Sequence, residues 1–218
     1  MVLGSIDWEV MLYAIPYMLK GALVTLQISA LSMLLGCLVG IVCGFFLLSE
    51  IVPLKWFVRS YVYFVRGTPA LVQIFLVYFA LPVIGIEIPP FWGAVVALGF
   101  NAGGFIAEIV RAGLQSVDSG QTEAAKAIGM THRQTLYYIL FPQSLRVITP
   151  PLTNELITLV KGSSLLSAIS IYELTRATQL IISAKFTPFE LYALLAVFYL
   201  VIVSTLSKVS EYVERRLA

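Results

Sequence analysis

Residues 21–49 read GALVTLQISALSMLLGCLVGIVCGFFLLS, a run without a charged side chain. A helix that crosses the hydrocarbon core of a bilayer needs about 20 mostly apolar residues, and this run exceeds that length. The rest of the chain has the same character, because 59% of its 218 residues are hydrophobic and 12% are charged. Such a chain has too little polar surface to cover a water-soluble globule of its size. The sequence therefore predicts an all-α integral membrane protein.

Apolar segments of spanning length recur along the chain, which we interpret as one transmembrane domain over residues 1–218. We predict five spans, over about residues 21–49, 57–84, 88–114, 138–171 and 189–210. The fourth is the least regular, because Pro142, Pro150 and Pro151 are expected to break it early.

The segment before the first span, about residues 6–20, mixes Trp8, Tyr13 and Tyr17 with charged side chains. This composition is typical of the headgroup region of a bilayer. We predict a separate interfacial helix here, with the aromatic residues as bilayer anchors rather than as a ligand-binding cluster.

Small residues follow one face of the first span. Gly36, Gly40 and Gly44 are four apart, and this spacing permits close packing against another helix, in this chain or in a second copy. Cys37 and Cys43 lie six apart and point to different sides of the helix, so they are interpreted as packing residues.

The distribution of basic residues predicts the orientation, because lysine and arginine are enriched on the cytoplasmic side. If the polar loop between the third and fourth spans is cytoplasmic, most basic residues outside the spans share its side. These are Lys55, Arg59, Arg111, Lys126, Arg133, Arg146, Lys208, Arg215 and Arg216, against Lys20, Arg176 and Lys185 on the other side. The amino end is then outside and the carboxyl end is cytoplasmic.

The polar loop, about residues 118–133, is expected to form a short helix along the membrane face. Asp118 or Ser119 is placed to cap its start, and Gly129 lets the chain turn away at its end. Small alanine side chains between them allow close approach by another protein. Glu123 is expected to be a docking or capping residue.

The spacing in this loop also resembles a known motif. Glu123-Ala124-Ala125 is followed by Gly129 after three residues, and by Ile139-Leu140-Phe141-Pro142 after a further nine. The pattern resembles the EAA loop of ATP-binding-cassette importers, where Leu is usual in place of Phe141. In that family the loop is a coupling helix that docks into a groove of the ATPase subunit. The resemblance assigns ATPase coupling to Glu123, Ala124, Ala125 and Gly129; an ordinary amphipathic loop helix is the alternative.

Three further motifs resemble the polar amino-acid permeases, a subgroup of these importers. They are Arg66-Gly67-Thr68-Pro69 followed by Gln73, Ala107-Glu108-Ile109-Val110-Arg111, and Asn154-Glu155-Leu156-Ile157 leading to Lys161 and Ser163-Ser164-Leu165. Gly162 departs from the pattern, in which Asp or Asn commonly follows the lysine. The resemblance, over about Thr25 to Glu173, implies a polar amino acid as cargo. Glu108 and Glu155 would suit a basic one, although both fit the common family pattern.

Eight polar residues within the predicted spans are candidates to line a substrate pathway. They are Arg66, Thr68, Gln73, Asn101, Asn154, Glu155, Lys161 and Ser163. A charge at the bilayer centre costs on the order of 2.5–3.5 kcal/mol, so these residues should face protein or water. Arg66 or Lys161 could meet the α-carboxylate of an amino acid, and Glu155 its α-amine or a basic side chain. For each residue alone, interhelical polar packing is an equally good explanation.

Two local features are predicted near these residues. Gly67 and Pro69 are poor residues for a helix interior, so the second span is expected to bend there, with a plain packing kink as the alternative. The backbone groups that the bend frees must meet protein or water. Glu108 and Arg111 lie three apart, where a helical ion pair is favoured over contact with substrate.

The chain lacks the sequence features of an enzyme. It contains no phosphate-binding loop of the Gly-x4-Gly-Lys-Ser/Thr type, no catalytic triad and no paired-histidine motif. Its single histidine, His132, has no nearby histidine or cysteine, so no metal site is predicted. We expect no cofactor in this chain and no nucleic-acid ligand. The family resemblance implies that ATP and Mg²⁺ are bound by the partner ATPase.

The number of spans indicates the partners. Five spans are too few for a sealed pathway of the kind that transporters build between repeats, so a homodimer or a pseudo-dimer with a related chain is predicted. The resemblance adds two ATPase subunits, an extracytoplasmic solute-binding protein and the cell membrane of a prokaryote. The alternatives are a secondary transporter or channel subunit that works without ATP, and a membrane scaffold. Both leave the spacing from Glu123 to Pro142 unexplained.

Overall fold

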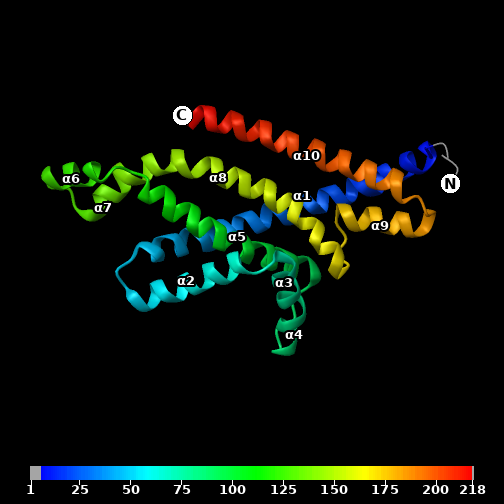
Figure 1. The fold of residues 1–218 in the computed structure, drawn as a ribbon, viewed down its shortest axis with the longest axis horizontal. Helices are drawn as coiled ribbons and strands as arrows, with labels where there is room; N and C mark the ends of the chain where they lie inside the picture. The colour runs from blue at the N-terminus through cyan, green and yellow to red at the C-terminus, as the bar shows by residue number, and fades with distance from the viewer. Residues whose placement is uncertain (1–5, 218) are drawn as a thin grey trace.

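The computed structural model describes residues 6–217 and contains no strand in that range. Its long helices run along the longest axis of the molecule (Figure 1). They are α1 (Trp8–Leu48), α2 (Val52–Gly67), α5 (Pro90–Gln115), α8 (Phe141–Gly162) and α10 (Pro188–Leu217). Of the described helices, α1, α5 and α10 are each long and apolar enough to cross a membrane, and two bent pairs raise the possible spans to five. The prediction of an all-α membrane protein is confirmed.

Helix α1 replaces both the interfacial helix predicted at 6–20 and the span predicted from residue 21. It is one helix of 41 residues, capped by Asp7 and continuous through Pro16. Gly21, at the predicted boundary, serves close packing, because a Cβ at this position would lie 2.9 Å from the Cα of Leu174. The predicted boundary is therefore wrong. At about 60 Å in length, α1 exceeds the hydrocarbon core of about 30 Å, and the interfacial placement of its first turns stays a prediction.

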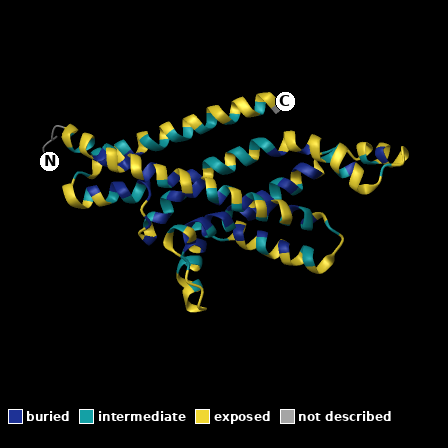
Figure 2. Cartoon of the chain, turned by 180° about the vertical axis from the view of Figure 1, so that it is seen from behind, coloured by how far each residue is buried: buried dark blue, intermediate teal, exposed yellow. Residues whose placement is uncertain are grey.

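The glycine face of α1 packs against α5 of the same chain, which answers a question that the sequence left open. A Cβ at Gly40 would lie 2.6 Å from the Cβ of Ile106, and one at Gly36 would lie 2.9 Å from the Cβ of Ala102. Buried residues concentrate where these helices meet, while α10 is largely exposed (Figure 2). Cys37 packs against this core, and neither it nor Cys43 is in a disulfide.

The second predicted span, 57–84, is bent rather than straight. Helix α2 ends at Gly67, and the chain turns by 114° into α3 (Ala70–Phe75), the π-helical segment η1 (Leu76–Ala80) and α4 (Leu81–Val83). Thr68 is extended at the turn, as expected for the residue before a proline. The predicted bend is confirmed, and beyond it α3 and α4 project away from the bundle (Figure 1).

The fourth predicted span, 138–171, belongs to a continuous helical segment. It runs through α7 (His132–Gln134), the π-helical η2 (Thr135–Leu140), α8 and the 3₁₀ segment η3 (Ser163–Ile169). The predicted early break is wrong, because Pro142 lies in the first turn of α8 and Pro150 and Pro151 lie inside it. Membrane helices tolerate proline where local π or 3₁₀ turns and threonine hydroxyls satisfy freed backbone groups. Here the π-helical η2 directly precedes α8, in whose first turn Pro142 lies.

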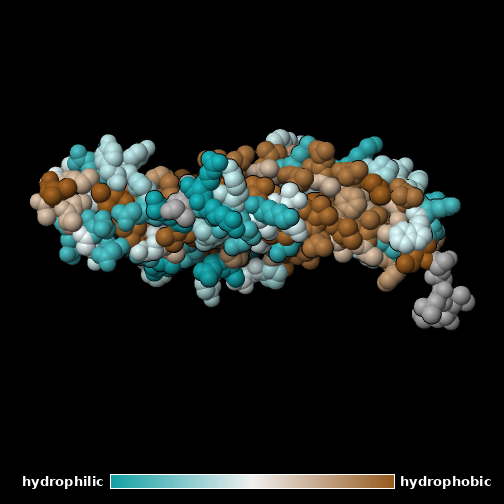
Figure 3. Space-filling view, turned by 90° about the horizontal axis from the view of Figure 1, so that it is seen from above, coloured by the Kyte–Doolittle hydropathy of each residue, from teal (hydrophilic) through white to brown (hydrophobic). Residues whose placement is uncertain are grey.

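A further helix, α9, was not predicted. The chain turns at Ser170, whose φ of 61° is left-handed, and α9 (Leu174–Lys185) follows with a bend of 45°. Helix α10 then extends the predicted fifth span, 189–210, in both directions. Seen from above, apolar side chains cover much of the half toward the amino-terminal end of α1, and the most hydrophilic ones gather near the middle, over the carboxyl-terminal part of α10 (Figure 3).

Candidate functional site

The predicted loop helix is present as α6 (Ser119–Ala127), at one end of the molecule (Figure 1). Asp118, one of the two predicted caps, accepts a hydrogen bond from the Gly120 N–H at 2.7 Å. At the other end, Gly129 adopts a φ of 80°, a left-handed conformation that favours glycine. Its N–H donates to the Lys126 carbonyl at 3.0 Å, so the chain reverses as predicted.

The four candidate coupling residues divide into one anchor and three exposed positions. Ala125 is buried at 3% exposure, whereas Glu123, Ala124 and Gly129 are exposed. Ile128, which the sequence analysis did not single out, is 78% exposed. Because Asp118 already caps the helix, Glu123 is left as an outward-pointing carboxylate beside small and apolar side chains.

Three of the pathway candidates meet at the bend after α2. The Gln73 side-chain amide donates to the Val65 carbonyl at 2.9 Å, to the Thr68 carbonyl at 3.1 Å and to the Thr68 hydroxyl at 2.9 Å. In a regular helix, the Val65 carbonyl would accept from residue 69, and Pro69 has no N–H to donate. Asn101 of α5 donates to Gln73 Oε1 at 3.0 Å and so ties the bend to the core.

This network gives Gln73 a structural part. Its side chain is 1% exposed and supplies the donor that Pro69 lacks. Ser163 is also fully buried, and its hydroxyl donates to the Val160 carbonyl at 2.9 Å. For these two candidates the polar-packing alternative describes the observed contacts; neither faces an open surface of the chain.

The candidates on α8 are arranged differently. Asn154 and Lys161 are exposed, and Glu155 is half-buried. Asn154 and Lys161 lie seven residues apart, so they share one side of the helix. Within residues 6–217, no ion pair joins Glu155 and Lys161. Arg66, at the end of α2, is also exposed and lines a groove beside α5.

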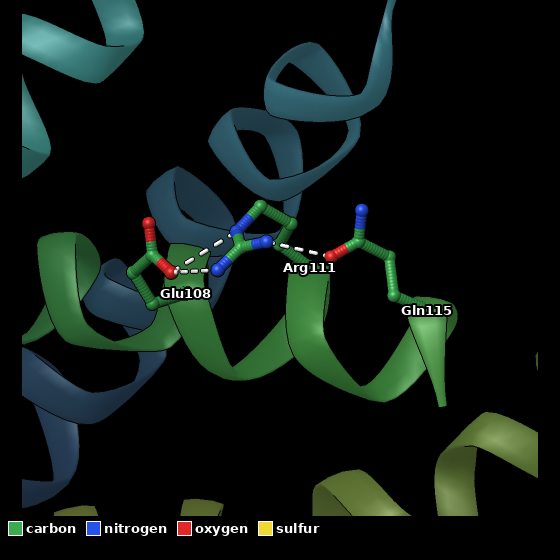
Figure 4. A network of polar contacts seen from close by, with 3 residues as sticks. All are labelled: Glu108, Arg111 and Gln115. Carbon is green, nitrogen blue, oxygen red and sulfur yellow. Dashed lines mark hydrogen bonds and ion pairs between the residues drawn. The ribbon is translucent and has the colours of Figure 1, made fainter.

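The predicted ion pair on α5 is confirmed. Arg111 donates from Nε and a terminal nitrogen to one oxygen of Glu108, at 3.0 and 2.6 Å (Figure 4). Its other terminal nitrogen donates to Gln115 Oε1 at 2.6 Å. Glu108 is therefore held by its own helix, one turn from its partner.

A buried carboxylate that the sequence analysis missed caps α9. Glu173 is fully buried and accepts hydrogen bonds from the N–H groups of Thr175 and Arg176, at 2.9 and 2.6 Å. Thr25 of α1 and Tyr199 of α10 also donate to it, at 3.5 and 3.4 Å. Glutamate is not one of the usual capping residues Ser, Thr, Asp and Asn. The only signal in the sequence was that an acid, Glu173, ends the segment that resembles the amino-acid permeases.

No group of three or more His, Cys, Asp or Glu side chains in the described part of the chain is arranged to hold a metal ion. The polar contacts of the candidate residues that are given above serve helix ends, the bend and the ion pair of α5.

The bundle of apolar helices and the exposed helix between two of them define a multi-span membrane subunit of a transport system. The chain belongs to the family of binding-protein-dependent transport system inner membrane components, whose family model matches residues 32–218. It is 38% identical to the glutamine transport system permease protein GlnP of Escherichia coli K12, over 97% of both chains. It is 35% identical to the arginine transport system permease protein ArtQ of Bacillus subtilis, over 98% of both.

A solved structure agrees with this assignment. A chain in the crystal structure of an amino acid ABC transporter with histidines matches with a TM-score of 0.92 and 38% identity, over 98% of this chain and 100% of that one. The relatives are permease subunits of amino-acid importers, and in this family ATP hydrolysis resides in separate subunits.

Proposed function

We propose that this chain is the permease subunit of an ATP-driven importer of a polar amino acid, and that α6 couples it to the ATPase. The observation that carries the proposal is the presentation of α6, which is capped by Asp118, closed by Gly129 and exposes Glu123 and Ala124 at one end of the molecule. Small side chains around one carboxylate make a compact knob that fits a groove of a partner. Two ATPase subunits, one for each α6, bind the ATP and Mg²⁺.

The exposed polar face of α8 supports a dimer. Asn154 and Lys161 lie on one side of a helix in the membrane, and both are exposed in the single chain. A lysine held against hydrocarbon costs about 2.5–3.5 kcal/mol. A second copy, or a related chain, that packs beside this face encloses a hydrated path and removes that cost.

The same groups suit an amino-acid cargo. In this proposal the exposed Lys161 or Arg66 receives the α-carboxylate, and the half-buried Glu155 receives an α-amine or a basic side chain. The names of the two relatives differ in their cargo, arginine in one and glutamine in the other. The proposal therefore extends to polar amino acids, with basic ones among the candidates.

The proposed orientation follows from the coupling role. With α6 in the cytoplasm, the amino end of α1 lies outside and the carboxyl end of α10 inside. A solute-binding protein then delivers the amino acid from outside, and closure of the ATPase dimer moves the two α6 helices. The transporter resides in the cell membrane of a prokaryote.

The coupling role is tested with Glu123→Arg and Gly129→Asp, and with Glu87→Arg as a matched control at an exposed acid outside α6. We expect both α6 variants to reach the membrane but to lose capture of the ATPase and amino-acid uptake, while the control keeps both. Full uptake coupled to ATP hydrolysis in both α6 variants would overturn the role of α6. Uptake that follows an ion gradient without any ATPase would instead support a secondary transporter.

A further inference from the structure

A groove between α2 and α5 gathers basic side chains that the proposed coupling does not use. It has a volume of about 420 Å³ and is lined by Leu47 and Leu48 of α1, Lys55 and Arg59 of α2, and Glu108 and Arg111 of α5. A second groove of about 380 Å³ shares Arg59 and Glu108 with the first and reaches Arg66. A basic strip therefore follows α2 from its first turn to its last.

The described residues do not compensate the charge of this groove. Glu108 is the one acid among its lining residues, and Arg111 already holds it through two nitrogens of the guanidinium (Figure 4). Across residues 6–217, no carboxylate lies within 4.0 Å of a side-chain nitrogen of Lys55 or Arg59. Three cations and one carboxylate leave the first groove with a net positive charge. An anion is the ligand that such a site favours.

The surroundings of the groove are apolar and aromatic. Trp56, Phe57 and Tyr63 of α2 are 62%, 74% and 81% exposed, and the Arg59 guanidinium lies 5.9 Å from the centre of the Trp56 ring. The groove begins beside the turn between α1 and α2, at the same end of the long axis as α6 (Figure 1). Exposed tryptophan and tyrosine beside basic residues are typical of the headgroup level of a membrane.

We propose that this groove binds the phosphodiester headgroup of an anionic phospholipid. Lys55 and Arg59 contact the phosphate oxygens, with Arg59 oriented by its stacking on Trp56. The acyl chains lie along the exposed aromatic residues of α2. A free phosphate ion has the same charge chemistry but gains nothing from the exposed aromatic side chains of α2, which is why the lipid is the favoured ligand. Basic pockets between membrane helices commonly hold anionic headgroups in this way.

Trp56 reports on lipid beside the groove, because the groove residue Arg59 stacks on its ring. The full-length chain with Trp8→Phe and Trp92→Phe retains Trp56 as its one tryptophan, since the sequence has three. It is reconstituted in bilayers, and quenching of Trp56 fluorescence by phosphatidylglycerol with brominated chains is compared with quenching by brominated phosphatidylcholine. Each signal is normalised to the unbrominated lipid of the same headgroup, so that changes in Trp56 emission cancel.

From the quenching we expect the site to prefer phosphatidylglycerol over phosphatidylcholine at least about fivefold, which is the effect of one cation near an anionic headgroup. Lys55→Gln combined with Arg59→Gln should reduce the preference to about one. The matched control is Lys208→Gln with Arg216→Gln, which also removes one lysine and one arginine stacked on an aromatic ring, here Tyr212. This control should keep the preference.

Four results would overturn the proposal. Equal quenching by the two lipids would show that the groove does not select an anion, and equal loss in the control variant would assign the effect to the general surface charge. Displacement of the brominated phosphatidylglycerol by millimolar glycerol phosphate or inorganic phosphate would make the site one for a soluble phosphate. Absence of quenching by either lipid would show that another protein surface covers the groove.

Discussion

Replacing Gln73 with methionine tests the account of the bend after α2. Methionine has nearly the same length and no amide, so the substitution keeps the buried volume and removes only the hydrogen bonds. The carbonyls of Val65 and Thr68 then lose their donor, and the Asn101 amide loses its acceptor.

The magnitude depends on whether the freed groups find other partners. Hydrogen bonds between membrane helices average about 0.6 kcal/mol because they usually do, whereas an unsatisfied buried group costs about 1–3 kcal/mol. The Val65 carbonyl is in the second situation, because Pro69 occupies the position of its usual donor. We therefore expect Gln73→Met to lower the free energy of unfolding by about 2 kcal/mol, which corresponds to roughly 4–8 °C in Tm.

Thermal unfolding in detergent, followed by a thiol-reactive dye, measures this change. Cys37 and Cys43 are free and half-buried, so they react when α1 leaves the core. Gln143→Met is the matched control, since the Gln143 side chain also donates to a carbonyl, that of Ile139 at 3.0 Å, but is exposed. The control should shift Tm by less than about 2 °C. Equal shifts in the two variants would refute the reasoning.

A second substitution separates the missing donor from a general loss of packing. Pro69→Ala in the Gln73→Met background restores an N–H four residues after Val65. We expect this double variant to regain stability relative to Gln73→Met, while the bend straightens and uptake is lost. If Pro69→Ala brings no recovery, the Val65 carbonyl is not the group that matters.

Two further substitutions test the packing of α8 and α9. A Cβ at Gly113 would overlap Cγ1 of Ile148, so Gly113→Ala should destabilise the fold by about 1–3 kcal/mol. In the double variant with Ile148→Ala, only the Cβ of residue 148 remains, 3.6 Å from the new Cβ at position 113, so part of the lost stability should return. The control Gly93→Ala enters open space and should leave the stability unchanged. If the losses of Gly113→Ala and Ile148→Ala simply add in the double variant, the contact is contradicted. Glu173→Ala leaves two backbone donors at the start of α9 without their acceptor, so it should lower the free energy of unfolding by about 2–4 kcal/mol. The control Glu87→Ala, at an exposed acid, should lower it by less than about 0.5 kcal/mol. Similar Tm values for the two variants would refute the buried cap.

The features that the sequence predicted well depend on neighbouring residues alone. The cap at Asp118, the turn at Gly129, the bend at Pro69 and the pair of Glu108 with Arg111 each involve groups at most four residues apart. Their geometry follows from backbone chemistry and helical periodicity. Tertiary packing does not change which of these groups face one another.

The predictions that were wrong concern breaks that tertiary packing overrides. Gly21 read as the end of an interfacial helix, yet α9 packs on it and α1 continues. Pro150 and Pro151 read as an early break, yet α8 runs through both. The glycine face of α1 was recognised, but its partner α5 lies more than fifty residues further along the chain. Single-sequence patterns do not carry this long-range information.

The structural role of one polar residue in the membrane helices, Gln73, could have been predicted from the sequence. Glutamine, asparagine and serine occur in membrane spans both where they line a path and where they hydrogen-bond a free backbone group. Residue type alone therefore left both explanations open. A proline, however, identifies the carbonyl it deprives, four residues earlier. Pro69 points to Val65, and an amide one turn after the proline, at Gln73, is placed to reach back to that carbonyl. The same spacing relates Pro150 to Asn154, but Asn154 is exposed, so the spacing alone does not identify a structural amide. Asn154 and the exposed Lys161 stay candidates for a pathway.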